Sequence, residues 1–166
     1  MLDRPVRRRD LGRGILAGCH RAWLARTGSA VLGVAVLVLT VGRAATCNPV
    51  ARASHGVYGT ATVLLALFSP LAWDGRPGSA AEATWHAVLA AVAVAAYLAG
   101  VAAVRVGHGP RPGRAGAFDV VVLAASCVLV AATLTMPSTA GLTERLLHAA
   151  AMAWYGLQTV SADRSA

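Results

Sequence analysis

Charged residues are scarce in this chain. They make up 13% of its 166 residues, and lysine is absent, so that all 15 basic residues are arginine. Hydrophobic residues make up 57%, and the mean hydropathy is +0.60. A soluble globular domain carries about twice this share of charge. The composition therefore excludes an ordinary soluble domain and indicates a protein that lies in lipid.

Cysteines and catalytic motifs are equally sparse. Cys19, Cys47 and Cys127 fall in different segments without a CxxC pair, so they supply neither a disulfide framework nor a zinc site. Cys127 lies in an apolar run, where we expect a small buried hydrophobic residue. The sequence contains no nucleotide-binding glycine loop, HExxH motif or nucleophile elbow. We therefore expect no metal and no cofactor.

Apolar runs bounded by glycine, proline and charge dominate the rest of the chain. Because a bilayer core about 30 Å thick needs a helix of roughly 20 apolar residues, we predict five membrane-spanning helices. Their expected ranges are 27–41, 55–73, 84–106, 118–136 and 145–160. Short connections favour antiparallel neighbours. The predicted fold is an all-α membrane protein, a mostly up-and-down bundle over residues 27–161 that follows a basic segment at 1–26.

The net charge of +8 reflects how the arginines are distributed. Seven of them precede residue 27, and the others lie mostly in short loops between apolar runs. This pattern indicates membrane topology and contact with anionic lipids, and it excludes nucleic acid as the expected partner. We expect the inner membrane of a bacterium, with membrane lipids as partners, together with a membrane-protein partner or a second copy of the chain.

The positive-inside rule gives two conflicting orientations. With residues 1–26 set aside, one end of the bundle holds six arginines and the other holds two, which predicts that the 107–116 loop and the C-terminal tail are cytoplasmic. With residues 1–26 included in a five-helix bundle, the count becomes six against nine. A first helix missing upstream, or a first apolar run that does not span, would remove the conflict.

Small and aromatic residues suggest how the helices pack. Alanines recur every four residues from Ala87 to Ala103, a pattern that predicts a close helix contact. His55 and Asp119, near the starts of the second and fourth runs, are interpreted as helix caps or interfacial anchors. An aromatic belt at the membrane surface is expected from Trp73, Trp85, Trp154 and Tyr155.

Two Glu-x-x-x-His pairs open the third and fifth predicted helices. This spacing places each pair on one helix face. Acidic residues at a helix start can simply stabilise the helix dipole, by about 0.3–1 kcal/mol. Alternatively, ionisable groups that gather at one end of the bundle form a polar site. The candidate catalytic residues are Glu82, His86, Glu144 and His148, and the candidate binding residues are Asp74 and Arg145.

Three stretches resemble a bacterial membrane family known as domain of unknown function 998. They are ALFSPLAWDG at 66–75, ATWHAVLAAV at 83–92 and GLTERLLHAAAMAW at 141–154. The resemblance covers most of residues 28–160 and implies a bundle that usually has six helices, the first of which is absent here. Two positions depart from the family pattern, because its second histidine falls at Ala90 and its turn aspartate is displaced to Asp74. The family implies no established activity.

Three functions agree with these features. The first is a structural or accessory protein of the envelope without chemistry of its own. The second is a membrane enzyme that acts on a lipid or isoprenoid through the Glu and His cluster. The third, a small transporter subunit, is less favoured because few charges lie in the middle of the predicted helices.

Overall fold

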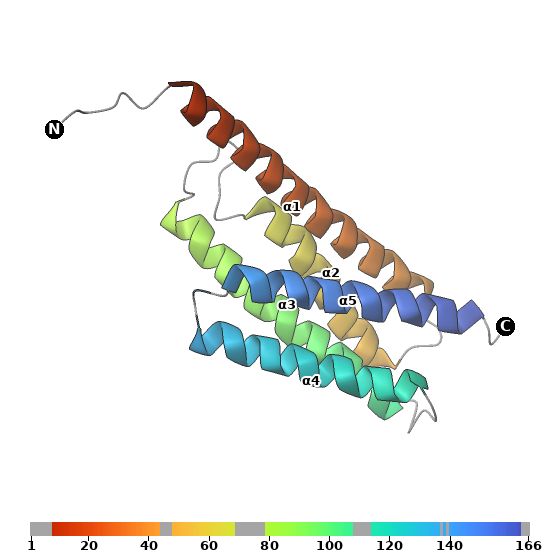
Figure 1. The fold of residues 1–166 in the computed structure, drawn as a ribbon. Helices are drawn as coiled ribbons and strands as arrows, with labels where there is room; N and C mark the ends of the chain where they lie inside the picture. The colour runs from red at the N-terminus through yellow and green to blue at the C-terminus, as the bar shows by residue number, and fades with distance from the viewer. Residues whose placement is uncertain are drawn as a thin grey trace.

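The computed structural model describes residues 8–43, 48–68, 79–107, 114–136, 138 and 140–163. Within these residues it contains five long α-helices and no strand, which confirms the predicted all-α bundle (Figure 1). The helices are α1 (Arg8–Gly42), α2 (Pro49–Leu67), α3 (Ala80–Gly107), α4 (Arg114–Thr135) and α5 (Ala140–Asp163).

Each helix begins before the apolar run that predicted it. Helix α1 begins at Arg8, inside the predicted basic segment, and α2 begins six residues before His55. At the start of α2, the Asn48 side chain accepts a hydrogen bond from the Val50 backbone N–H at 2.8 Å, and Pro49 occupies the first turn. Such polar first turns extend a helix beyond its hydrophobic part, so hydropathy alone places the starts too late.

Three segments of the described chain are long and apolar enough to cross a membrane. They are Trp23–Gly42, Ala80–Gly107 and Gly116–Thr135. Large apolar side chains on these helices face outward, as shown by Val106 at 81% and Leu134 at 78% exposure. An apolar outer surface of this kind is stable in lipid, where it needs no polar cover. The chain is therefore a membrane protein.

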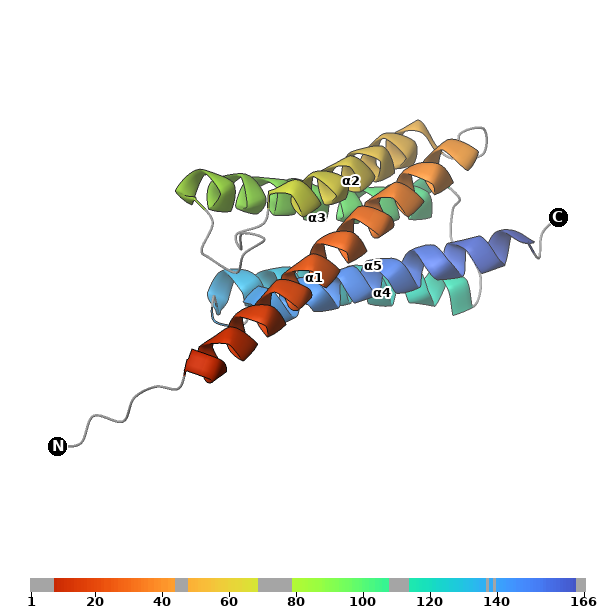
Figure 2. The ribbon, with the colours of Figure 1, turned by 90° about the horizontal axis from the view of Figure 1, so that it is seen from above.

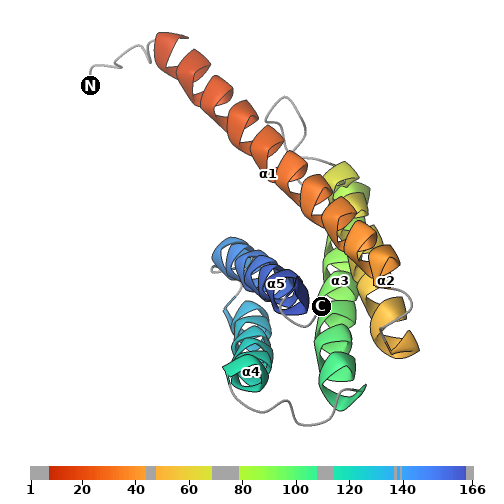
Figure 3. The same ribbon diagram turned by 90° about the vertical axis from the view of Figure 1, so that its right-hand side faces the viewer.

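Four of the helices form two layers, and α1 packs on the outside of one of them. Helices α2 and α3 pack together in one layer, and α4 and α5 form the other (Figures 2 and 3). Helix α1 packs along α2, and its N-terminal half extends beyond the rest of the bundle (Figure 3). The starts of α3 and α5 lie at the same end of the bundle as this extension (Figure 1). We call it the cleft end, because a cleft described below opens there.

The contact between α1 and α2 depends on two glycines. A Cβ atom at Gly33 would lie 2.7 Å from the Gly59 carbonyl oxygen and 2.8 Å from the Val63 backbone nitrogen. A Cβ atom at Gly59 would in turn lie 3.0 Å from the Gly33 carbonyl oxygen. All three distances are shorter than an ordinary contact of a methyl group, so the two backbones approach as closely as small residues allow in membrane helices.

The two layers are joined by an interior aromatic cluster formed by His55 and Tyr58 of α2, Tyr97 of α3, and Trp154 and Tyr155 of α5. All five side chains are buried. The ring centroids of His55 and Trp154 are 5.3 Å apart, and those of Tyr58 and Tyr155 are 5.9 Å apart in a stacked arrangement. Large rings thus fill the space between the layers.

The predicted aromatic belt is therefore wrong for two of its four members. Trp154 and Tyr155 are in the core, at 2% and 8% exposure, while Trp85 is 55% exposed as expected. Trp73 lies outside the described residues. The difference arises because α5 faces aromatic residues of both α2 and α3, so its own aromatic residues gain more contact inside the bundle than at its surface.

The predicted alanine contact is also wrong for four of its five members. Ala87, Ala91, Ala95 and Ala99 are exposed on the outer face of α3, whereas Ala103 is half-buried against the core. The residues of α3 that face the core are Ala93, Ala96, Tyr97, Gly100 and Val101. Small residues are tolerated on a lipid-facing surface as well as at a contact, so their period does not identify the buried face. Cys127, expected to be buried, is likewise exposed on α4.

The close approach of α1 and α2 predicts a specific response to an added methyl group. Gly33→Ala should lower the free energy of unfolding by about 1–3 kcal/mol, because the new Cβ meets backbone atoms that cannot rotate away. Gly56→Ala on α2 is the matched control, since nothing lies within 4 Å of its Cβ position. Thermal unfolding in detergent measures both variants. Equal melting temperatures for the two would contradict this packing.

Candidate functional site

His86 and Glu144 meet at the cleft end of the bundle. Their side chains come from the starts of α3 and α5, and His86 Nε2 lies 3.6 Å from Glu144 Oε1. His86 Nδ1 lies 2.8 Å from the carbonyl oxygen of Phe68, the residue that ends α2. Because a carbonyl oxygen only accepts, Nδ1 is assigned as the donor in this hydrogen bond, and Nε2 is directed to the carboxylate. Three helices thus position one imidazole–carboxylate contact, which is an ion pair when His86 is protonated.

His148 lies one turn after Glu144 on α5. Its Nδ1 is 3.0 Å from the Glu144 carbonyl oxygen, so the backbone orients this second imidazole as well. Arg145, between them in sequence, is exposed. The predicted convergence of the third and fifth helices is therefore found for His86, Glu144 and His148, with Arg145 beside them.

These residues line a cleft between α1, the start of α3 and α5. The cleft has a volume of about 420 Å³, within the range of small-molecule sites. On the α1 side it is lined by Leu24 and by Arg26, a buried residue that belongs to the sequence-predicted basic segment. On the α5 side Met152 continues the apolar lining. The cleft is therefore amphipathic, with charged and apolar walls.

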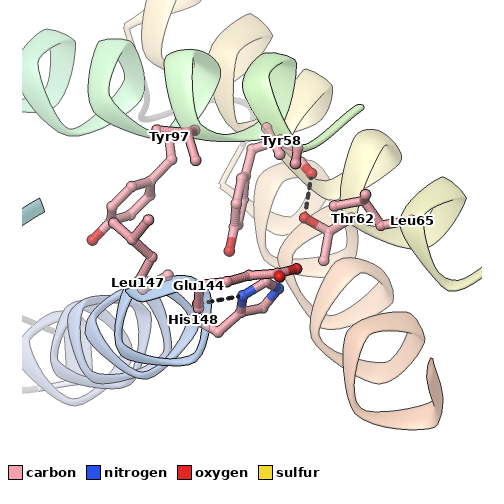
Figure 4. Close-up of a pocket in the computed structure, with 11 residues that line it drawn as sticks. Tyr58, Thr62, Leu65, Tyr97, Glu144, Leu147 and His148 are labelled. Atoms are coloured by element: carbon pink, nitrogen blue, oxygen red, sulfur yellow. Dashed lines mark hydrogen bonds between the residues drawn. The ribbon is translucent and has the colours of Figure 1, made fainter. Parts of the chain in front are cut away.

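A smaller cavity of about 40 Å³ lies behind the cleft, toward the middle of the bundle. In Figure 4 the Tyr58 ring points toward Glu144 and His148 on α5, and the Tyr97 ring points toward Leu147. Leu65, Glu144 and His148 line both the cavity and the cleft. The carboxylate and the second imidazole thus separate the open cleft from the aromatic interior.

Glu82 does not belong to the cleft, contrary to the prediction. Its carboxylate accepts hydrogen bonds from the Ser79 backbone N–H at 2.8 Å and from the Ser79 hydroxyl at 3.2 Å. The Glu82 backbone N–H donates in return to the Ser79 hydroxyl oxygen at 3.2 Å. This reciprocal arrangement is a capping box, so Glu82 stabilises the start of α3. Asp74, which was predicted together with Arg145 as a binding residue, lies outside the described residues.

The environment of Glu144 favours its charged form. The neighbouring His86 imidazole, as a hydrogen-bond donor to the carboxylate, lowers the pKa of the Glu144 carboxyl below its usual value. Burial acts in the opposite direction. Glu144 lies in the first turns of α5, outside the three segments long and apolar enough to span. A carboxylate beside two oriented imidazoles can exchange protons or balance a cationic wall.

A second polar cluster lies inside the bundle, away from the cleft. Trp154 Nε1 donates to Asp119 Oδ1 at 2.9 Å, and the Gln158 side-chain amide is 3.4 Å from the same oxygen. Asp119 is 1% exposed. The Tyr155 hydroxyl lies 2.8 Å from His55 Nδ1. Contrary to their interpretation as caps or anchors, His55 and Asp119 therefore connect helices in the core.

Glycine makes room for this cluster. A Cβ atom at Gly100 would lie 2.5 Å from His55 Cε1, so the imidazole rests directly against the backbone of α3. Asp119 follows Phe118 and precedes six apolar residues, and a carboxylate in such a run is the one sequence signal of a buried partner. The partner itself, 35 residues away along the chain, has no signature in the sequence.

Among the residues that the structure describes, no group of three or more His, Cys, Asp or Glu side chains is arranged to hold a metal ion. His86, Glu144 and His148 carry acid–base and hydrogen-bonding groups.

Comparison with known proteins yields no relative. No protein-family model matches the chain, and no match is found among curated proteins or among solved structures. The resemblance to domain of unknown function 998 stays a prediction that rests on the three quoted stretches.

The Trp154–Asp119 hydrogen bond predicts a measurable contribution to stability. Trp154→Phe keeps an aromatic ring but removes the donor from a buried carboxylate, which should cost about 1–3 kcal/mol. Trp85→Phe, at an exposed position, should cost less than half as much. Chemical unfolding followed by circular dichroism in detergent compares the two. A loss confined to the Trp85 variant would show that the buried bond contributes nothing.

Proposed function

We propose that this chain is a multi-pass protein of the bacterial inner membrane with a structural or accessory role. It exerts this role by holding a membrane amphiphile in the cleft between α1 and α5. The observation that carries the proposal is the amphipathic lining of this cleft, where Arg26, His86 and Glu144 lie beside Leu24 and Met152.

The depth of the cleft supports the same function. The residues that line it on α1 begin at Leu24, one residue after the first membrane segment starts at Trp23. His86 lies six residues into α3, next to the exposed Trp85. Exposed tryptophans are typical of the membrane surface, so the charged groups face the headgroup region and the apolar groups face the hydrocarbon. An amphiphile at this depth satisfies both.

The continuity of α1 bears on the orientation. The prediction of a cytoplasmic 107–116 loop depended on setting residues 1–26 aside, yet α1 runs without interruption from Arg8 to Gly42. With all five helices crossing, nine arginines lie at the cleft end and six at the other. We therefore propose the reverse orientation, in which the cleft end faces the cytoplasm.

Cysteine labelling at the two ends of α3 tests this orientation. In a background with Cys19, Cys47 and Cys127 changed to serine, Val106→Cys should react with a membrane-impermeant maleimide in intact cells. Ala80→Cys, at the other end of the same helix, should react only after permeabilisation. Labelling of Ala80→Cys from outside would reverse the proposed orientation, and labelling of both from one side would exclude α3 as a membrane-spanning helix.

Filling the cleft tests the binding role. Ala149→Trp places a large ring in the cleft, whereas Ala153→Trp places the same ring on the exposed surface of α5 outside it. Native mass spectrometry of the purified protein should detect a co-purified amphiphile in the wild type and in the Ala153 variant. The Ala149 variant should lose most of it. Equal retention in all three proteins would contradict binding in the cleft.

A membrane enzyme is the second candidate, favoured by the contact between His86 and Glu144 in the cleft. An imidazole whose Nδ1 is held by a backbone carbonyl and whose Nε2 faces a carboxylate is arranged for proton transfer to a bound lipid or isoprenoid. In the same mass spectra, such an enzyme would convert the bound amphiphile to a product of different mass. Glu144→Gln would abolish the conversion while binding persists.

A further inference from the structure

Arginine forms part of the cleft on two of its walls. Arg26, from α1, is 7% exposed and lies at the start of the first membrane segment, Trp23–Gly42. Arg145, from α5, is exposed at the other side of the cleft. Ionisable groups at this depth in a membrane protein mark ligand sites, and the planar guanidinium group matches the geometry of phosphate oxygens.

The balance of charge in the cleft favours an anion. Glu144 is the single acid among the described residues that line it, and His86 Nε2 lies 3.6 Å from its carboxylate. Two guanidinium groups and two imidazoles thus line the cleft beside one carboxylate. The cleft therefore attracts a negatively charged group.

The apolar lining indicates that this group belongs to a lipid. Leu24, Leu65 and Met152 line the cleft together with the charged residues. Trp23 and Trp85, 52% and 55% exposed, lie next in sequence to cleft residues and mark the depth of the membrane surface. A free phosphate would leave the apolar walls in water, whereas a lipid covers them with its acyl chains.

We infer that the cleft binds the phosphate headgroup of an anionic membrane lipid, with Arg26 and Arg145 as the residues that contact the phosphate. The inference rests on the proposed function, since it names the chemistry of the amphiphile that the cleft holds. Basic pockets between membrane helices are a known form of headgroup recognition. Charge-assisted, bidentate hydrogen bonds from arginine supply both affinity and selectivity for phosphate.

Lipid titration of the purified, delipidated full-length protein tests the inference by native mass spectrometry. Phosphatidylglycerol should bind, and Arg26→Gln should weaken it by roughly 10- to 100-fold, the effect of losing a charge-assisted hydrogen bond. Arg145→Gln should weaken binding in the same direction, and because this side chain is exposed, its loss leaves the core intact. Arg52→Gln, an exposed arginine near the start of α2 at the opposite end, should bind as the wild type does.

Two further probes separate the possible results. Diacylglycerol lacks the phosphate, and equally tight binding of it would overturn headgroup recognition while the binding of an amphiphile stands. Glycerol phosphate lacks the acyl chains, and equally tight binding of it would overturn a lipid as the source of the phosphate. Failure of all three probes to bind would overturn the proposed function together with the inference.

Discussion

The space between the two helix layers is set by the large rings of α5. Trp154 and Tyr155 pack against His55, Tyr58 and Tyr97, and Trp154 donates a hydrogen bond to the buried Asp119 carboxylate on the neighbouring helix, α4. In lipid, helices gain no hydrophobic advantage from association, so packing and hydrogen bonds between helices carry the assembly. These rings therefore set the distance between the two layers.

The cleft follows from the contrast between two kinds of helix contact. Helix α1 approaches α2 through Gly33 and Gly59 at backbone distance, whereas α5 stands off from α2 and α3 by the width of aromatic rings. Helix α1 is thereby held close to one layer and leaves space beside the other. At the end of the bundle where the aromatic cluster stops, this space opens as the cleft, with polar groups on both sides.

Sequence periodicity and composition predict those features that are determined within a single helix, such as its position in the chain. They locate all five helices and the pairing of His86 with the start of α5, because both pairs of Glu and His open parallel helices. They misplace Glu82, since a capping glutamate and a site glutamate have the same spacing. The contact of Tyr155 with His55 joins residues 100 positions apart, which no local pattern encodes. The outward face of α3 was predicted wrongly because alanine occurs both on lipid-facing surfaces and in contacts between helices.

The separation of these contacts along the chain has a consequence for biogenesis. Helices α1, α2 and α3 contact their sequence neighbours and can assemble as soon as they leave the translocon, whereas the α4–α5 hairpin depends on partners inserted much earlier. Such distant contacts are slow to form. The hairpin is therefore expected to enter the bilayer as an independent unit and to dock last. Until it docks, His55 of α2 and Tyr155 of α5 lack the hydrogen bond that joins them, which makes the undocked intermediate a natural substrate for membrane quality control.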